Sequence, residues 1–211
     1  MKRWIEQKNF EISGRYDKQV TGKYSKAYTR TIEKTRCYLK DTYSVLDFAC
    51  GTGITTVELA KNVKEIRAID ISDNMIDLAK KKMEKHDIKN VNFTTCDIMS
   101  DTIKDQSFDV VLAFNILYFL EDIDEILIRI RHILKSGGLF ISVTDCLGEK
   151  KSILNVFQSF LSTIGIIPYT RKYKMRELEC LIEKAGFSII ETDNFYTNPP
   201  NYFVVAQVNL P

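Results

Sequence analysis

The chain is poor in the residue types that carry proton transfer and metal chemistry. Its 211 residues include only two histidines, His86 and His132. His86 falls at the end of a predicted helix and His132 lies outside the apolar stripe of another, so neither is placed as a catalytic base. No histidines, cysteines and acids are spaced as the ligands of a metal site. The sequence therefore predicts chemistry that uses neither a histidine base nor a metal.

The chain also lacks the segments that lead a protein into or across a membrane. No apolar run approaches the roughly 20 residues that a membrane-spanning helix needs. The polar N-terminus has no apolar stretch of the kind found in signal peptides. The five cysteines are odd in number and show no C-x-x-C spacing, which favours reduced thiols. We therefore expect a cytoplasmic protein without a membrane partner.

Excess charge of either sign is missing as well. The 30 Lys and Arg residues nearly balance the 28 Asp and Glu residues, which gives a net charge of +2. A protein that binds nucleic acid through its backbone phosphates usually carries a strongly basic surface, so this balance argues against such a partner. With 45% hydrophobic residues, the chain can build a core as one domain.

The most informative stretch is Ser44–Gly53, which reads SVLDFACGTG. It predicts a short buried strand that runs into a loop with glycines at 51 and 53, followed by a helix. Glycines let a backbone approach a ligand closely. Asp47 lies inside the strand, and a second acid, Asp70, ends the next apolar run about 20 residues later, where an acid can hold ribose hydroxyls. The pattern predicts a site for a nucleotide-like ligand.

Downstream of this stretch, strands and helices alternate, which predicts a parallel sheet with right-handed crossovers. The last part of the chain instead predicts two strands joined by Asn198-Pro-Pro-Asn201 as an antiparallel hairpin. The expected strands are 44–48, 66–70, 91–95, 108–114, 139–145, 187–196 and 202–208, and the expected helices are 29–39, 55–63, 73–86, 100–104, 122–135, 151–167 and 175–185.

The ordered segments VLDFACGTG, AIDIS, CDI and LKSGG resemble the class I, Rossmann-like, S-adenosylmethionine-dependent methyltransferases that act on small molecules. The resemblance covers about Ser44 to Asp145. It implies an α/β three-layer sandwich with a seven-stranded, mostly parallel sheet whose last strand is antiparallel. It also implies S-adenosyl-L-methionine as cofactor, S-adenosyl-L-homocysteine as product, and no metal.

The resemblance assigns cofactor contacts to the ends of the first four strands. It implies that Asp47 lies near the methionine ammonium, that Asp70 accepts the ribose hydroxyls and that Asp97 accepts from the adenine amino group. For Asp47 and Asp97, loop capping and helix capping are the alternatives, and for Met75 the alternative is a place in the core. The whole expected set is Asp47, Ala49, Cys50, Gly51, Gly53, Asp70, Ile71, Met75, Asp97, Ile98, Phe114 and Asn115.

The acceptor side carries fewer signals. We expect one domain, residues 1–211, with an N-terminal cap over residues 1–40 and an inserted helical lid at about 150–173. Catalysis is expected to depend on positioning, in a pocket walled by Tyr16, Tyr24, Asn115 and Tyr118. Tyr118 has the alternative of packing beneath the following helix.

Other functions remain open at this point. A dinucleotide-dependent oxidoreductase needs G-x-G-x-x-G, but Thr56 stands where the third glycine would be. The Asn-Pro-Pro-Asn-Tyr segment is similar to a motif of DNA methyltransferases but follows the wrong strand, so we interpret it as a hairpin turn. A binding module that holds S-adenosylmethionine without transferring its methyl group, and an RNA methyltransferase, are the alternatives to an enzyme acting on a small molecule.

Overall fold

We analysed a computed structural model of the chain, which describes residues 17–18, 21–22, 24–149, 170–197 and 199–209. The predictions made for Tyr16, for the helix at 151–167 and for Asn198 lie outside these residues. So does most of the expected lid at 150–173.

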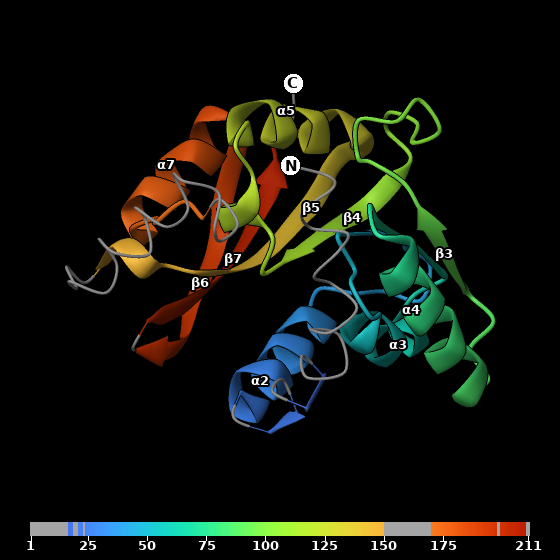
Figure 1. Ribbon diagram of the computed structural model, residues 1–211. Coiled ribbons are helices and arrows are strands. Elements are labelled where there is room, and N and C mark those ends of the chain that lie inside the picture. Colours follow the sequence, from blue (N-terminus) through green and yellow to red (C-terminus); the bar gives the residue numbers. More distant parts are fainter. Residues whose placement is uncertain (1–16, 19–20, 23, 150–169, 198, 210–211) are drawn as a thin grey trace.

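A seven-stranded sheet forms the centre of the molecule (Figure 1). Its strands run in the order β3-β2-β1-β4-β5-β7-β6, and β7 is antiparallel to both of its neighbours. All other neighbouring strands are parallel, which confirms the predicted sheet. The strands are β1 (Ser44–Phe48), β2 (Glu65–Asp70), β3 (Val91–Thr95), β4 (Phe108–Phe114), β5 (Leu134–Asp145), β6 (Phe187–Thr197) and β7 (Pro200–Val208).

Helices cover both faces of the sheet, so the molecule has three layers (Figure 1). One face packs against α2 (Ser25–Arg36), α3 (Ile54–Leu59) and α4 (Asp73–Lys85). The other face packs against α5 (Ile123–Ile133) and α7 (Met175–Lys184). Short 3-10 turns complete the connections at η1 (Ala60–Asn62), η2 (Leu117–Phe119) and η3 (Leu147–Glu149). Because both faces are covered, Val45 and Leu46, which point to opposite faces of β1, are both fully buried.

The apolar period of α5 explains its place in the fold. Ile123, Leu127, Ile130 and Ile133 are spaced three or four residues apart and are all buried. This confirms the predicted helix, although it ends at Ile133 and the chain enters β5 directly.

The helix expected at 100–104 is wrong, because this segment forms turns. The Asp97 side chain accepts a hydrogen bond from the Met99 amide at 3.0 Å, and the Ser100 hydroxyl accepts one from the Thr102 amide at 3.3 Å. Short polar side chains that take up backbone N–H groups in this way compete with a helix. Other boundaries also differ. The helix expected at 29–39 spans Ser25–Arg36, and the helix expected at 55–63 ends at Leu59 and continues as η1. The strand expected at 139–145 begins earlier, at Leu134.

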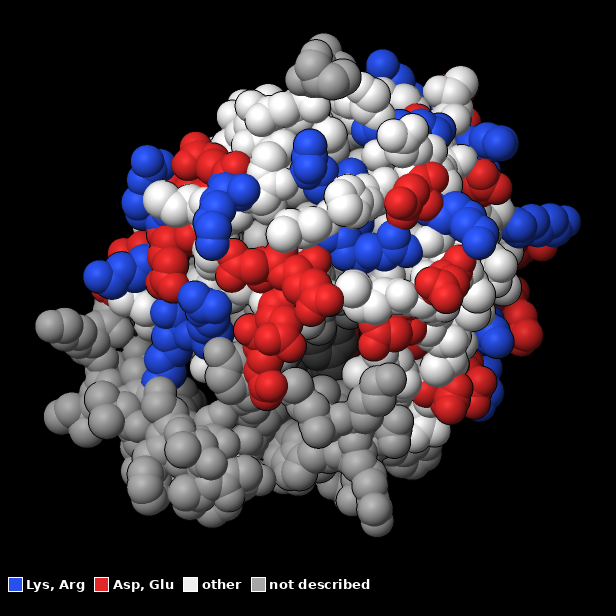
Figure 2. All heavy atoms as spheres, turned by 90° about the horizontal axis from the view of Figure 1, so that it is seen from above, with Lys and Arg blue, Asp and Glu red and all other residues white. Residues whose placement is uncertain are grey.

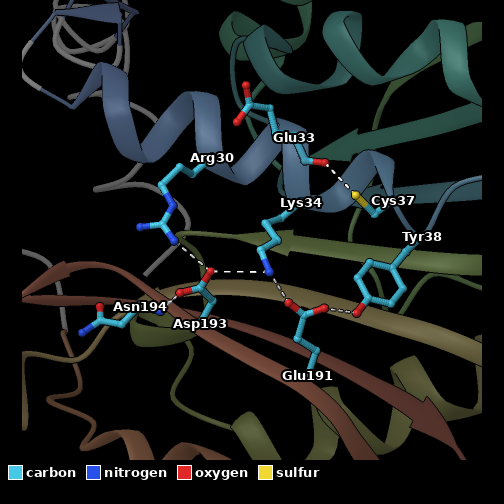
Figure 3. A network of polar contacts seen from close by, with 8 residues as sticks. All are labelled: Arg30, Glu33, Lys34, Cys37, Tyr38, Glu191, Asp193 and Asn194. Carbon is cyan, nitrogen blue, oxygen red and sulfur yellow. Dashed lines mark hydrogen bonds and ion pairs between the residues drawn. The ribbon is translucent and has the colours of Figure 1, made fainter.

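Polar contacts fasten α2 to β6, an element from the other end of the chain (Figure 3). Lys34 and the Tyr38 hydroxyl both donate to Glu191, and Arg30 donates to Oδ2 of Asp193 at 2.9 Å. Below this network, Ala27 and Ile32 are buried in the same core as the sheet. The helix that precedes the glycine loop is therefore held against the C-terminal hairpin.

Candidate functional site

The loop after β1 bends sharply at the carboxyl end of the sheet. Ala49, Gly51 and Gly53 all have positive φ angles, of 58°, 55° and 68°. A Cβ atom at Gly53 would lie 2.7 Å from Cζ of Phe93, whereas one at Gly51 would have no heavy atom within 4 Å. Gly53 is thus required for packing against β3, while Gly51 borders open space. The loop therefore exposes backbone at the position where the sequence predicts a ligand.

Asp47 is buried beneath this loop, with 3% of its surface exposed. One carboxylate oxygen, Oδ2, accepts a hydrogen bond from the Thr56 hydroxyl at 2.5 Å. Burial raises the pKa of Asp47 to about 7, the nearby Asp70 charge adds to the rise, and the Thr56 bond opposes it. A cation placed beside Asp47 would favour its ionised form. Its environment is therefore suited to a positively charged ligand group.

Asp70 ends β2 and connects two segments of the site. Its Oδ2 accepts the Gly51 amide at 2.9 Å, and its Oδ1 accepts the Ser72 amide at 2.9 Å. Burial raises the pKa of Asp70, and these backbone bonds act against the rise. The two carboxylate oxygens together have four lone-pair sites, so backbone amides do not use up their capacity to accept donors. Asp70 can therefore accept donors from a ligand while it holds the loop.

The residues expected around an adenine ring lie at the ends of β2 and β3. Ile71 and Met75 are partly exposed, and the Met75 amide is held by the Ser72 hydroxyl at 3.4 Å. Asp97 is partly exposed and forms the turn with Met99 instead of capping a helix. Ile98 is 1% exposed and belongs to the core that contains α5. For Cys50, burial raises the pKa of the thiol well above its usual value, which disfavours a reactive thiolate.

At the end of β4, Asn115 adopts a left-handed conformation with φ 55° and donates its amide hydrogen to the carbonyl of Val143 at 2.8 Å. Its side-chain Oδ1 is buried and has no hydrogen-bond partner among the described residues. The preceding residue, Phe114, is partly buried against the core that contains α2. This left-handed turn at a strand end places Asn115 at the same edge as Asp47 and Asp70.

The two described tyrosines of the expected acceptor pocket lie in different surroundings. Tyr24 is 42% exposed, and its ring meets that of Tyr196 edge to face at 5.9 Å. Tyr118 packs against the core that contains α5 and α7, and its carbonyl accepts the Arg171 amide at 2.7 Å. The packing alternative for Tyr118 therefore agrees with its contacts.

Sequence reasoning missed a contact that brings the N-terminal segment onto the glycine loop. Asp17 accepts a hydrogen bond from the Thr52 hydroxyl at 2.6 Å and pairs with Lys82 of α4 at 2.7 Å. Lys82 also donates to Thr52 at 3.2 Å. No sequence pattern marks Asp17, because the three residues are far apart in the chain. Asp145, which ends β5, was also missed, although an acid at a strand end was the signal that identified Asp70.

The described residues limit other kinds of site. Among them, no three or more histidines, cysteines and acids gather as metal ligands. No described helix is both long and apolar enough to span a membrane.

Comparison with known proteins identifies the same region. Residues 39–184 match the family model of a methyltransferase domain. Demethylmenaquinone methyltransferase of Lactococcus lactis subsp. lactis is 31% identical over 172 residues, which are 70% of this chain and 67% of that protein. Ubiquinone biosynthesis O-methyltransferase of Coxiella burnetii is 26% identical over 168 residues, 74% of this chain and 68% of that protein. A chain in the solved complex of the Haloferax volcanii Trm112 methyltransferase activator with a methyltransferase has a similar fold. The TM-score between it and this chain is 0.74 at 18% identity, and the match covers 93% of this chain and 95% of that one.

Proposed function

This chain belongs to the methyltransferase domain family and is an S-adenosylmethionine-dependent methyltransferase, and we propose that its acceptor is a small molecule methylated by in-line displacement. The observation that carries the cofactor half of this proposal is the link between Gly51 and Asp70. It supports a ribose-binding site in which the glycine backbone and a carboxylate face the same open space.

The residues present fit the cofactor. We infer that Asp70 holds the ribose diol and that Asp47 faces the methionine ammonium. Asp47 is buried and pairs with no cation among the described residues, which leaves it suited to receive one. The backbone of Ala49, Cys50 and Gly51 would lie beneath the methionine. When bound, the cofactor supplies an activated methyl group on a sulfonium.

We infer that the other expected contacts are made by residues at the neighbouring strand ends. Ile71 and Met75 would pack on the adenine ring, Asp97 and the Ile98 amide would bond its edge, and Phe114 and Asn115 would border the methyl group. Gly53 supports the loop through its packing against Phe93.

The protein's contribution to rate under this proposal is mainly positional. Holding the nucleophile, methyl carbon and sulfur in line can supply roughly 7–11 kcal/mol of the barrier. Asn115, in its left-handed turn, would line the side of the pocket that receives the acceptor. Tyr24 and Tyr196 would line the side next to the N-terminal cap. Tyr118, whose ring packs with Phe119 at 4.4 Å, would act mainly by supporting the acceptor side.

A small-molecule acceptor is favoured over a nucleic acid by charge. The net charge is +2, and on the face viewed in Figure 2 basic side chains are interspersed with acidic ones. Acidic side chains flank a hollow near the centre of this face (Figure 2), which would repel a polyanion. The methylation of quinone precursors, named for both curated relatives, further supports a small aromatic acceptor.

A cytoplasmic location is supported by five cysteines that are all unpaired.

Transfer of a labelled methyl group tests the proposal. The protein is incubated with methyl-labelled S-adenosylmethionine and separate metabolite, RNA and protein fractions of a bacterial extract. We expect label in the metabolite fraction. Label confined to RNA or protein, or tight cofactor binding with no transfer to any fraction, would contradict a small-molecule acceptor.

A further inference from the structure

Three polar side chains stand at the ends of adjacent strands, next to the expected methyl position. Asn115 follows β4, Asp145 ends β5, and Asn201 lies near the start of β7. The sheet places β4, β5 and β7 side by side, and Asp145 is directly paired with Asn201. Since β1 borders β4 on one side and β5 borders it on the other, these residues extend the functional edge away from the glycine loop.

Asp145 is a partly buried acid with one engaged oxygen. Asn201 Nδ2 donates to Oδ1 of Asp145 at 2.7 Å. Among the described residues, Oδ2 accepts no hydrogen bond and no basic side chain pairs with the carboxylate. Burial raises the pKa of Asp145, and the Asn201 bond opposes the rise. A desolvated carboxylate that is oriented by a neighbour and has no counter-ion among the described residues is typical of a group that takes up a proton.

The neighbouring amides show which substrate chemistry would match. The Oδ1 atoms of Asn115 and Asn201 are buried and have no partner among the described residues, and Asn201 is only 7% exposed. Leaving such oxygens unpaired costs stability, so a ligand that donates hydrogen bonds would be favoured there. Together with Oδ2 of Asp145, these two oxygens form a group of hydrogen-bond acceptors. They would hold an amine as its ammonium ion, which has no lone pair to attack a methyl carbon, whereas a hydroxyl group remains a nucleophile.

On the basis of the proposed function, we propose that Asp145 is the general base for methyl transfer to a hydroxyl group of the acceptor. Asn201 is the positioning residue that holds the carboxylate, and Asn115 receives a second hydroxyl donor. As the hydroxyl oxygen forms its bond to the methyl carbon, the carbon–sulfur bond breaks and its electron pair stays on sulfur. The hydroxyl proton moves to Oδ2 of Asp145. The products are a methyl ether, S-adenosylhomocysteine and protonated Asp145, which then releases the proton to water.

A series of acceptors with graded acidity tests this role. Wild type, Asp145→Asn and Asn201→Ala are assayed with S-adenosylmethionine and ring-substituted catechols, from unsubstituted catechol to 4-nitrocatechol. A hydroxyl that is already ionised needs no base. We therefore expect Asp145→Asn to lower kcat about 100-fold for catechol and much less for 4-nitrocatechol, with a smaller loss of the same trend for Asn201→Ala.

Matched controls separate this role from a structural one. Asp193→Asn removes a different acid from the β6–β7 hairpin, one that pairs with Arg30. The kcat of this variant relative to wild type should be the same for every catechol. Calorimetric binding of S-adenosylhomocysteine should be unchanged in Asp145→Asn. An equal loss of kcat for every catechol would overturn the general-base role. If wild type binds S-adenosylmethionine but methylates no catechol, the hydroxyl assignment is wrong while the cofactor site stands; if it does not bind S-adenosylmethionine, the proposed function itself fails.

Discussion

Gly51 donates its amide hydrogen to Oδ2 of Asp70 across 2.9 Å, so the acid that ends β2 holds the loop that follows β1. One carboxylate thereby shapes the loop and faces the expected ribose. A substitution at Asp70 should affect ligand binding in two ways, through the lost contact and through a loosened loop.

We predict that Asp70→Ala weakens S-adenosylhomocysteine binding at least tenfold. Loss of charge-assisted hydrogen bonds costs on the order of 1.5–3 kcal/mol, which corresponds to roughly 10- to 150-fold in affinity. Asp73→Asn is the matched control, because Asp73 begins α4 and its carboxylate bonds Thr95 rather than the loop. Isothermal titration of both variants measures the difference, and equal affinities would place the ribose elsewhere.

Cofactor affinity should depend on pH through Asp47. In the free protein burial raises the pKa of Asp47 to about 7, and a bound cation would lower it. Binding then releases a proton, so affinity rises as the pH increases through about 7 and levels off above it. Titrations between pH 6 and 8 in buffers of different ionisation enthalpy measure this release. Asp47→Asn should remove it, and an unchanged pH dependence in that variant would show that another group is responsible.

The contact between Asp17 and Lys82 should slow cofactor release. It joins the N-terminal segment to α4 and, through Thr52, to the glycine loop. Asp17→Asn and Lys82→Met are each expected to speed dissociation of S-adenosylhomocysteine about fivefold, since a partly exposed pair contributes about 1 kcal/mol. In stopped-flow measurements the double variant should dissociate no faster than either single one. If the increase in dissociation rate of the double variant equals the product of the two single increases, the two residues act separately.

The ion-pair network that joins α2 to β6 should stabilise the folded protein at neutral pH and less so in acid. The Lys34 bond lowers the pKa of Glu191, so this contribution is present at neutral pH and is lost as the pH falls through the lowered value. Glu191→Gln should reduce Tm by about 2 °C at pH 7, because partly exposed pairs are screened by solvent. Glu33→Gln is the control, because Glu33 lies on α2 beside Lys34 and its carboxylate has no ion pair among the described residues (Figure 3). Equal melting temperatures for the two variants would contradict this stabilising role.

Local patterns were sufficient to predict most of the sheet. The apolar runs of β1 and β2 and the stripe of Ile123, Leu127 and Ile130 each appear within a short window, and the structure confirms them. The segment at 100–104 was predicted wrongly because its side chains bond their own backbone, which an apolar pattern does not reveal.

The site was predictable only where it follows strand ends. Gly51 and Asp70 belong to local patterns, and the structure brings them into contact. The contact of Asp17 with Lys82 joins residues 65 positions apart, and the pairing of Asp145 with Asn201 spans 56. Such pairs depend on the order of strands and on where the chain places Asp17 against α4, and neither is encoded in local spacing.

A crystal structure with S-adenosylhomocysteine bound tests the central claim most directly. We predict that the ribose hydroxyls lie within hydrogen-bond distance of the two Asp70 oxygens, with the amino group toward Asp47 and the sulfur toward Asn115. A ligand bound away from the loop at Gly51, or a ribose held by another acid, would contradict it.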